Sequence, residues 1–405
     1  LVPSQAAALD PASVSAIVAA RGSATAHAAI IARALGIPTV VGLGPRILAV
    51  ADGTRLLVDA SAGTVAVDPR QEALAQARTR AERSAARGAE ALARTREPVM
   101  LADGRRVQIL ANIASPEQAR LAVERGAEGV GLLRTEFLYL DRTQPPDEDE
   151  QTRTLQRIAA ELQGRPLVVR TLDAGADKPL AYLATSEETN PFLGVRGIRL
   201  ALREPELLSA QMRAALRVAA EHPVRLMLPM VCRPEEVQGA RELLARARAQ
   251  TRIQAPLELG IMVEVPAAAL MAEELAEHVD FFSVGSNDLT QYTLAAERGN
   301  AELAPLLAEP APAVLRLIAM TLEAARAHGR WVGVCGEMAG DPAVAALLVG
   351  LGVDELSVSP PLIPAVKAAL RGLDGVRAQE AAQAAMRASS AAAAREHGLS
   401  LLEDR

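Results

Sequence analysis

Two neighbouring stretches, Gly260-Ile-Met-Val-Glu264 and Phe281-Phe-Ser-Val-Gly-Ser-Asn-Asp288, decide the fold of this chain. Each begins with an uninterrupted apolar run that is too short for a helix and ends in polar residues. This pattern is typical of a parallel strand that is buried on both faces. It recurs along the chain and predicts eight strands, at Val107–Asn112, Gly129–Leu133, Leu167–Thr171, Arg225–Met230, Gly260–Glu264, Phe281–Val284, Trp331–Cys335 and Glu355–Val358.

Amphipathic helical stretches separate these strands, for example Pro116–Arg125, Pro234–Ala249 and Ala311–Ala327. Eight strand–helix units in roughly 270 residues match the number of units and the length of a (β/α)8 TIM barrel. An open doubly wound sheet is the competing architecture, but it usually has fewer strands. We therefore predict an α/β protein whose main domain is a TIM barrel.

The chain before the barrel has a different pattern. Short β-like runs at Ser15–Ala19, Thr39–Val41, Arg55–Val58 and Thr64–Val67, with one helical stretch at His27–Leu35, predict a small α/β unit. An Ala-, Arg- and Glu-rich helix follows, and its lack of bulky apolar residues is typical of a linker. The predicted domains are a partial α/β unit at 1–69, a linker helix at 70–97, the barrel at 98–375, and a C-terminal helix and tail at 376–405.

The composition excludes several classes of protein. The 405 residues carry a net charge of −6 and only 2% aromatic side chains, which argues against a nucleic-acid binder. Cys232 and Cys335 are far apart in sequence, so neither a disulfide framework nor a zinc-binding pair is indicated, and we expect a cytoplasmic protein. Of the 43 basic residues only Lys178 and Lys367 are lysines. The arginine bias makes the retention of Lys178 notable, whereas Lys367 has no motif around it.

Polar and reactive residues recur where the predicted strands end, which is where TIM barrels place their chemistry. They are Arg134, Arg170, Glu264, Asn287, Asp288 and Cys335, with Arg298 ten residues after Asp288. The arginines, without a matching excess of carboxylates, indicate a multiply charged anion such as a phosphate or a carboxylate. Glu264 and Asp288 on neighbouring strands can share one hard cation, for which Mg²⁺ is the best candidate. The plainer alternative is that these two carboxylates pair with Arg134 or Arg298.

Among the five histidines, His27 is the candidate nucleophile. It follows a turn of small residues and opens a predicted helix, where the helix dipole favours neutral imidazole. Free N–H groups at a helix start also bind phosphoryl groups. A neutral imidazole in that position can accept a phosphoryl group. Arginines and Mg²⁺ at the rim, with an acceptor elsewhere, indicate phosphoryl transfer.

These residues lie in motifs that resemble a known family. Gly22-Ser-Ala-Thr-Ala-His27 and the helix after it resemble the phosphohistidine signature of phosphoenolpyruvate-utilising enzymes. The barrel motifs look like enzyme I of the bacterial phosphoenolpyruvate:sugar phosphotransferase system. They are Gly131-Leu-Leu-Arg-Thr-Glu-Phe137, Arg170-Thr-Leu-Asp-Ala-Gly-Ala-Asp-Lys-Pro179, Asn190-Pro-Phe-Leu-Gly-Val-Arg196, Ile261-Met-Val-Glu-Val-Pro266, Gly285-Ser-Asn-Asp-Leu-Thr290 and Val334-Cys-Gly-Glu-Met-Ala-Gly340.

The resemblance implies that the phosphoryl group of phosphoenolpyruvate passes to His27, with release of pyruvate, and then to a histidine-containing phosphocarrier protein. It implies Mg²⁺ on Glu264 and Asp288 and a proton from Cys335 to the departing enolate. Cys232 receives no role. The resemblance also implies a swivelling phosphohistidine domain and a homodimer formed through the barrel. The substrate would be gripped by Arg134, Arg170, Asn287 and Arg298, with Lys178 and Arg196 as further contacts.

Two departures from the family pattern are visible. Ser23, Ala24 and Ala26 stand where enzyme I commonly has Gly, Arg and Ser. The chain begins at Leu1, so we expect an N-terminally truncated form that lacks the subdomain for docking the phosphocarrier and relays to it poorly. The alternatives are an enzyme of the pyruvate phosphate dikinase or phosphoenolpyruvate synthase type, and a catalytically silent barrel used for dimerisation or regulation.

Overall fold

The structure of the chain is a computed structural model. The residues it describes are 9–10, 13–22, 32, 37–60, 62–140, 142–175, 180, 182–183, 188–298, 300, 302–307 and 309–403. Two compact units make up the chain, one of Leu1–Glu90 with Ala295–Leu307 and one of Ala91–Leu294 with Ala308–Arg405. Each unit is considered by itself.

The first unit contains two small sheets. Strands β1 (Ile17–Val18) and β2 (Thr39–Val40) pair in parallel, and β3 (Leu56–Asp59) pairs antiparallel with β4 (Thr64–Val67). All four lie inside the predicted β-like runs, within one residue at their ends, although two of them are shorter than predicted. The predicted helix at 27–35 lies outside the described residues, apart from Ala32.

The predicted linker helix is present as α3 (Gln71–Ala93). None of its described side chains is buried, as expected for a helix with alanines in place of large apolar residues. It leads into a turn and the short strand β5 (Val99–Met100), which pairs antiparallel with the first barrel strand.

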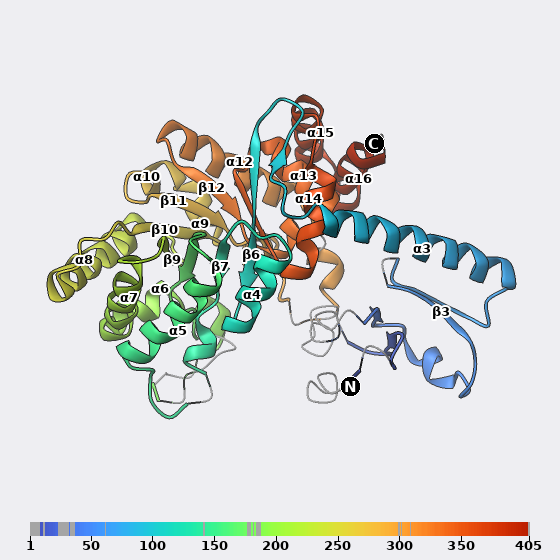
Figure 1. The fold of residues 1–405 in the computed structure, drawn as a ribbon, viewed down its shortest axis with the longest axis horizontal. Helices are drawn as coiled ribbons and strands as arrows, with labels where there is room; N and C mark the ends of the chain where they lie inside the picture. Colours follow the sequence, from blue (N-terminus) through green and yellow to red (C-terminus); the bar gives the residue numbers. More distant parts are fainter. Residues whose placement is uncertain are drawn as a thin grey trace. The chain divides into compact units, whose positions relative to one another are not determined.

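The second unit is a closed barrel of eight parallel strands, which confirms the predicted TIM barrel (Figure 1). Neighbours along the chain are neighbours in the sheet, and pairing of the last strand with the first closes it. The strands are β6 (Arg106–Ile113), β7 (Val130–Leu133), β8 (Leu167–Arg170), β9 (Val224–Leu228), β10 (Glu258–Val263), β11 (Phe281–Val284), β12 (Trp331–Val334) and β13 (Glu355–Val358).

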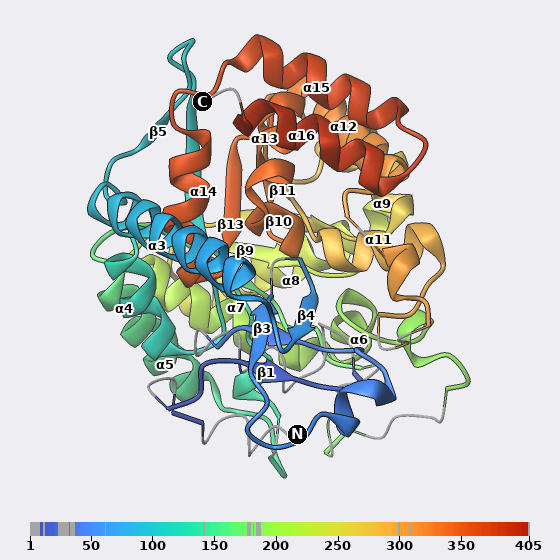
Figure 2. The ribbon, with the colours of Figure 1, turned by 90° about the vertical axis from the view of Figure 1, so that its right-hand side faces the viewer.

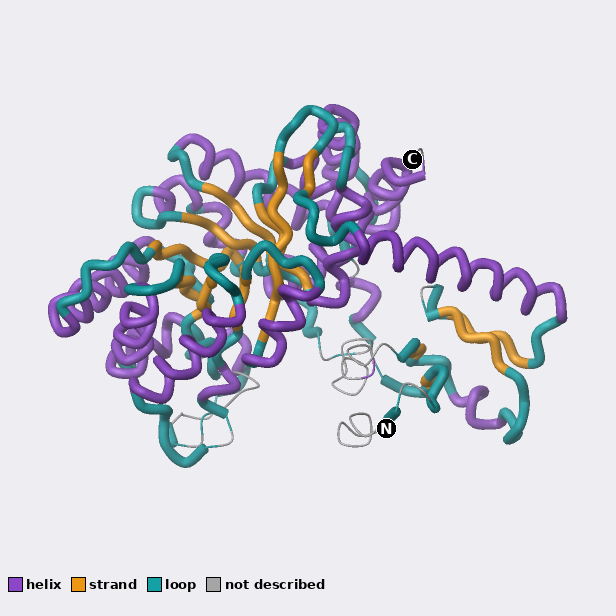
Figure 3. Tube along the Cα trace, in the orientation of Figure 1, coloured by secondary structure: helices purple, strands orange, loops and turns teal. Residues whose placement is uncertain are grey.

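Helices surround these strands, as Figure 3 shows by colour. They are α4 (Pro116–Glu124), α5 (Glu148–Glu161), α6 (Ile198–Arg203), α7 (Pro205–Ala219), α8 (Pro234–Thr251), α9 (Pro266–Leu270), α10 (Ala272–Ala276), α11 (Ser286–Leu294), α12 (Pro312–Ala327), α13 (Pro342–Leu351) and α14 (Ile363–Leu370). Ala304–Ala327, which contains α12, is the one described stretch long and apolar enough by composition to cross a membrane. Because α12 buries Val314, Leu315, Ile318 and Leu322, its apolar face is explained by packing on the barrel.

The C-terminal region differs from the predicted single helix and tail. It forms two helices, α15 (Gly375–Arg387) and α16 (Ala391–Glu403), which lie beside α13 (Figure 2). A Cβ on Gly398 would lie 2.3 Å from the carbonyl oxygen of Ala343, so α16 approaches the start of α13 closely. The alanine-rich sequence at the predicted end of the helix therefore continues as a second packed helix.

Alternate residues of each barrel strand point inward. Inside the barrel Phe281 stacks on Trp331 at 4.4 Å between ring centroids, and the Arg225 guanidinium lies 4.9 Å from the Trp331 ring centroid. Gly260 makes room for this stack, because a Cβ there would lie 2.6 Å from the Phe281 ring. The interior is therefore filled with side chains, as expected for a barrel of this size.

Lys367, which the sequence left without a role, lies buried at the junction between the linker and the barrel. Its Nζ donates to the carbonyl oxygens of Thr95 at 2.9 Å and Glu97 at 3.3 Å and lies 3.5 Å from Glu128 Oε1. Burial lowers the pKa of Lys367 and the Glu128 carboxylate opposes this shift. A compact ammonium with three donors suits two carbonyls and one carboxylate.

Replacing Lys367 with Met should destabilise the barrel by about 2–4 kcal/mol, because it leaves two carbonyls and the Glu128 carboxylate without this donor. Urea unfolding followed by the fluorescence of Trp331, the single tryptophan, reports on the barrel unit. The exposed Arg246→Met variant is the matched control and should change stability by less than about 0.5 kcal/mol. Equal midpoints for the two variants would contradict the junction role.

Candidate active site

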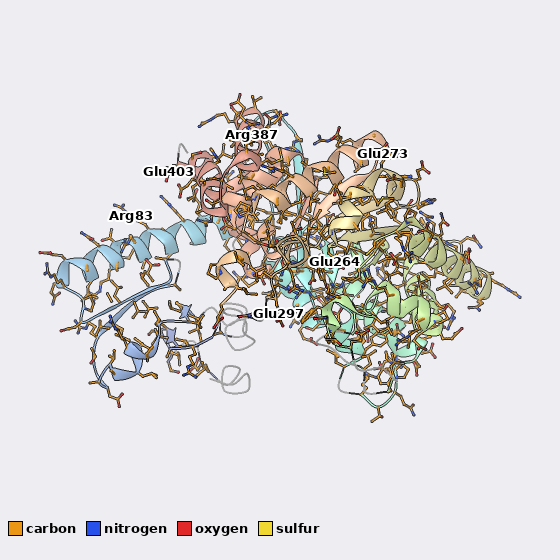
Figure 4. The ribbon with its side chains drawn as sticks, turned by 180° about the vertical axis from the view of Figure 1, so that it is seen from behind. Arg83, Glu264, Glu273, Glu297, Arg387 and Glu403 are labelled. Carbon is orange, nitrogen blue, oxygen red and sulfur yellow. The ribbon has the colours of Figure 1, made fainter. Side chains whose placement is uncertain are left out.

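The candidate site lies where the barrel strands end, and the inward alternation of the strands selects its members. Arg170 ends β8, Glu264 follows β10, and Cys335 follows β12. Asn287 and Asp288 lie in the first turn of α11, directly after β11. In Figure 4, Glu264 lies within the barrel unit, whereas Glu273 and Arg387 lie on outer helices. Closure of the barrel therefore brings together residues that lie at or just after the ends of four different strands, β8, β10, β11 and β12.

A buried ion network forms one side of the site. Arg170 Nη2 donates to Glu136 Oε1 at 2.6 Å, and Arg170 Nη1 lies 3.2 Å from Asp173 Oδ2. Asp173 also accepts two bonds from Arg196, at 3.2 Å from Nε and 2.8 Å from Nη2. Arg196 Nη1 lies 3.1 Å from the Tyr292 hydroxyl. The carboxylates hold both guanidinium groups in fixed orientations before any ligand arrives.

This network corrects one expectation. The sequence suggested arginines without matching carboxylates, yet Arg170 and Arg196 share Asp173, and Glu136 pairs with Arg170. Arg170 nevertheless has one donor that these carboxylates do not use. Its Nε is buried with no hydrogen-bond partner within the described part of the chain. A buried N–H of this kind is suited to an anionic ligand.

Two carboxylates lie on the other side of the site. Glu264 is 1% exposed and Asp288 is 8% exposed. Glu264 Oε1 accepts from the backbone N–H of Met230 at 2.7 Å, and Met230 adopts a left-handed conformation with φ 61°. Left-handed backbone at a non-glycine residue is uncommon, and such strain concentrates at functional sites. Asp288 Oδ1 lies 3.8 Å from Arg196 Nη1, so the Arg196 guanidinium connects Asp288 to the arginine network.

The environment of Glu264 favours its neutral form. Burial raises the pKa of Glu264 to about 8, and the charges of Asp173 and Asp288 act in the same direction. Arg170 and Arg196 oppose this shift. With Glu136 on Arg170, four carboxyl groups therefore face two guanidinium groups in this buried site. The excess negative charge is relieved by a proton on Glu264 or by a cation.

The carboxylates fit a magnesium ion. No group of three or more His, Cys, Asp or Glu side chains arranged for a metal occurs among the residues that the structure describes. Mg²⁺ needs fewer protein ligands than that, because one or two carboxylates suffice when substrate oxygens and water complete the octahedron. Glu264 and Asp288 supply oxygen ligands only, and their mutual repulsion is the condition that a cation relieves.

Cys335 lies in the barrel interior as a protonated thiol. It is 2% exposed and packs with Leu132, Val168, Met227 and Met262. Burial raises the pKa of Cys335 to about 11, and a hydrogen bond with Ser283 opposes that shift. The thiol therefore carries its proton at neutral pH, as an acid must before it donates.

The remaining predicted site residues are Arg134, Asn287, Arg298, His27 and Lys178. Arg134 is exposed after β7, and the Asn287 side-chain oxygen accepts from the backbone N–H of Glu337 at 2.7 Å. Arg298 belongs to Ala295–Leu307, which is part of the first unit. His27 and Lys178 lie outside the described residues.

Sequence reasoning missed the partners of the predicted residues. Glu136 and Asp173 lie within the quoted motifs but received no role, and Tyr292 and Met230 lie in none of these motifs. A carboxylate three residues after Arg170 was the available signal for Asp173. No local pattern points to Met230, because its bond to Glu264 joins the ends of two strands.

Replacing Asp173 with Asn should lower the pKa of Glu264 below about 8, because the Asp173 charge is one of the causes that raise it. Carbon-13 NMR of δ-labelled glutamate measures the titration, and Glu264→Gln assigns the signal. Asp341→Asn is the control, since Asp341 pairs with Arg395 on the outside of the barrel and should leave the titration unchanged. An unaltered midpoint in Asp173→Asn would show that the network is not coupled to Glu264.

Comparison with known proteins shows which family the chain resembles. Residues 89–374 match the family described as PEP-utilising enzyme, PEP-binding domain, and residues 1–63 match the PEP-utilising enzyme, mobile domain. The phosphoenolpyruvate-protein phosphotransferase of Haloferax volcanii is 46% identical over 400 residues, which cover 97% of this chain and 69% of that protein. The protein of the same name from Bacillus subtilis is 41% identical over 364 residues, 89% of this chain and 64% of that protein.

A multiphosphoryl transfer protein of Xanthomonas campestris pv. campestris is 49% identical over 394 residues, which cover 96% of this chain and 47% of that protein. The chain thus spans about half the length of the multiphosphoryl transfer proteins that it matches. The match to the PEP-binding domain covers well over half of the chain, and the Haloferax relative is covered over more than two thirds of its length. The chain therefore belongs to the phosphoenolpyruvate-protein phosphotransferase family of PEP-utilising enzymes.

Proposed function

We propose that this chain takes the phosphoryl group of phosphoenolpyruvate onto His27 and releases pyruvate. The observation that carries the proposal is the convergence at one end of the barrel of two fixed arginines, two close carboxylates and a protonated thiol. Arg170 and Arg196 supply positive charge, Glu264 and Asp288 supply cation ligands, and Cys335 supplies a proton. When its phosphoryl group leaves, phosphoenolpyruvate needs positive charge around its anionic groups, a bound cation and a proton for the enolate.

The arginines would bind and orient the substrate. Arg170 Nε and the exposed Arg134 provide donors for the phosphate and carboxylate groups, with Arg196, Asn287, Arg298 and Lys178 as further contacts. Because Asp173 and Glu136 already fix the Arg170 guanidinium, little side-chain entropy is lost on binding. Mg²⁺ held by Glu264 and Asp288 would neutralise charge on the phosphoryl oxygens.

Cys335 would protonate the enolate at C3. The S–H bond breaks as the C–H bond of pyruvate forms, and the phosphoryl group moves to the His27 imidazole. A thiol whose pKa is raised to about 11 remains protonated until a strong base such as an enolate is generated. Burial among apolar side chains keeps Cys335 away from bulk solvent, which would otherwise compete as a proton source.

The remaining parts of the proposal follow the family. The onward acceptor would be a histidine-containing phosphocarrier protein in sugar uptake, and the protein would work in the cytoplasm as a dimer through the barrel. We assign 1–69 to the phosphohistidine domain, 70–97 to the linker helix, 98–375 to the barrel and 376–405 to the C-terminal helices.

A pre-steady-state measurement tests the proposal. Wild-type chain mixed with phosphoenolpyruvate and Mg²⁺ should release a burst of pyruvate close to one equivalent, detected with lactate dehydrogenase, and His27→Ala should give no burst. Cys335→Ala should slow the burst by about 10²–10⁴-fold, the usual contribution of a positioned acid. Cys232→Ala is the matched control and should behave as wild type. A full burst from His27→Ala would refute the assignment of the acceptor.

Binding of Mg²⁺ should become tighter as pH rises from 6 to about 8 and then level off. Glu264 carries a proton below its pKa of about 8, and the cation must displace that proton to bind. Titration calorimetry in buffers of different ionisation enthalpy measures the released proton. Glu264→Gln should bind weakly and lose the pH dependence, whereas proton release equal to that of the wild type would contradict the role of Glu264.

A further inference from the structure

Glu355, at the start of β13, is a buried carboxyl group in the barrel interior that the proposed reaction does not use. It lies in register with Gly333 on β12, and Gly333 lies in register with Ser283 on β11. The residues on either side of each, such as Phe282, Val332, Val334 and Leu356, belong to the core between strands and helices. Glu355, Gly333 and Ser283 therefore form one inward-facing row across three adjacent strands.

Two glycines allow the Glu355 carboxyl group to come close to the neighbouring strands. A Cβ on Gly333 would lie 3.4 Å from Glu355 Oε1. A Cβ on Gly131 would lie 2.5 Å from Glu355 Oε1 and 2.6 Å from Ser357 Oγ, so these two oxygens are no more than about 5 Å apart. The Ser357 hydroxyl is buried with no hydrogen-bond partner within the described ranges. A buried hydroxyl of this kind is suited to an ordered water as its partner.

The far end of the row reaches the thiol. Ser283 is 3% exposed, and its hydroxyl is hydrogen-bonded to Cys335. The Cys335 thiol also donates to the carbonyl oxygen of Val284 at 3.5 Å, and the residue packs against Leu132, Val168 and Met262. The polar contact at Ser283 therefore leads from the thiol toward Gly333 and Glu355 through a mostly apolar interior.

The environment of Glu355 suits a group that exchanges protons near neutral pH. Burial raises the pKa of Glu355 to about 7. The Arg225 charge opposes this shift, while the charges of Asp354 and Glu128 add to it. A carboxyl group with that pKa holds a proton in a substantial fraction of molecules at pH 7 and can both give and regain it.

We propose that Glu355 resupplies the proton that Cys335 gives up, through the Ser283 hydroxyl and water above Gly333. The inference rests on the proposed function, in which Cys335 donates a proton to the enolate. The resulting thiolate takes a proton from the Ser283 hydroxyl, which takes one from the carboxyl group of Glu355 by way of water. Glu355 is left as a carboxylate and regains a proton from solvent at the start of the strands. One proton is consumed for each pyruvate released.

Isotope exchange in D₂O tests the route and needs no phosphocarrier. With phosphoenolpyruvate, Mg²⁺ and carbon-13-labelled pyruvate, the transfer of carbon label between the two compounds counts reversible turnovers. Deuterium at C3 of pyruvate, followed by NMR and mass spectrometry, counts proton exchange between Cys335 and solvent. The ratio of deuterium incorporation to carbon exchange measures resupply separately from turnover.

Glu355→Gln should lower this ratio by roughly tenfold or more, within the range that positioned proton transfer contributes to catalysis. The proton abstracted from pyruvate would then return to the same carbon instead of exchanging. Gly333→Ala should act in the same direction, because its methyl group would occupy the space beside Glu355 Oε1 at an ordinary contact distance while the carboxyl group stays in place. A loss of stability alone would lower carbon exchange and leave the ratio unchanged.

Glu258→Gln is the matched control. Glu258 is a half-exposed carboxylate at the same end of the barrel that pairs with Arg225 at 2.7 Å, and its removal should leave the ratio at the wild-type value. An unchanged ratio in both Glu355→Gln and Gly333→Ala would overturn the route. Absence of carbon exchange in the wild type would instead contradict the proposed function, and the route with it.

Discussion

The pairing of β13 with β6 is the constraint on which the rest of the barrel depends. Once the last strand bonds to the first, all eight strands run parallel around a closed interior and their ends meet at one rim. Side chains must then alternate strictly between the interior and the helices. Arg170, Glu264 and Cys335 each occupy an inward position at the end of a strand, so closure alone is enough to collect them.

Bringing charged groups into a closed interior costs free energy, and pairing between the arginines and carboxylates of the site offsets part of this cost. Removing charged groups from water costs several kcal/mol for each group, unless the charges are paired and hydrogen-bonded. Asp173 meets this need for Arg170 and Arg196 together, and Glu136 adds a second carboxylate to Arg170. Glu264 is left with two neighbouring carboxylates, and burial with this repulsion raises its pKa to about 8. The same imbalance makes the site receptive to a cation.

At the start of the strands the barrel interior holds polar and apolar side chains side by side. Phe281 and Trp331 stack near the start of their strands, and Arg225 covers the indole ring. Glu355 lies in this region beside two glycines, and the Ser283 hydroxyl connects it toward Cys335. The small residues in these strands are therefore part of the chemistry of the interior, because a larger side chain at Gly131 would collide with Glu355 and Ser357.

The sequence by itself determined the barrel, the linker helix and the residues at the strand ends, because apolar runs and their polar ends are local patterns with a fixed period. Arg170, Glu264, Asp288 and Cys335 could be selected from position alone. Only the tertiary structure decided how these groups are paired: Asp173 between two arginines, Glu264 on the N–H of Met230, and Lys367 on the carbonyls of the linker. It also decided that the C-terminal region folds as two helices. Such contacts depend on distances set by the curvature of the closed sheet and by the packing of helices on it, which no local pattern in the sequence contains.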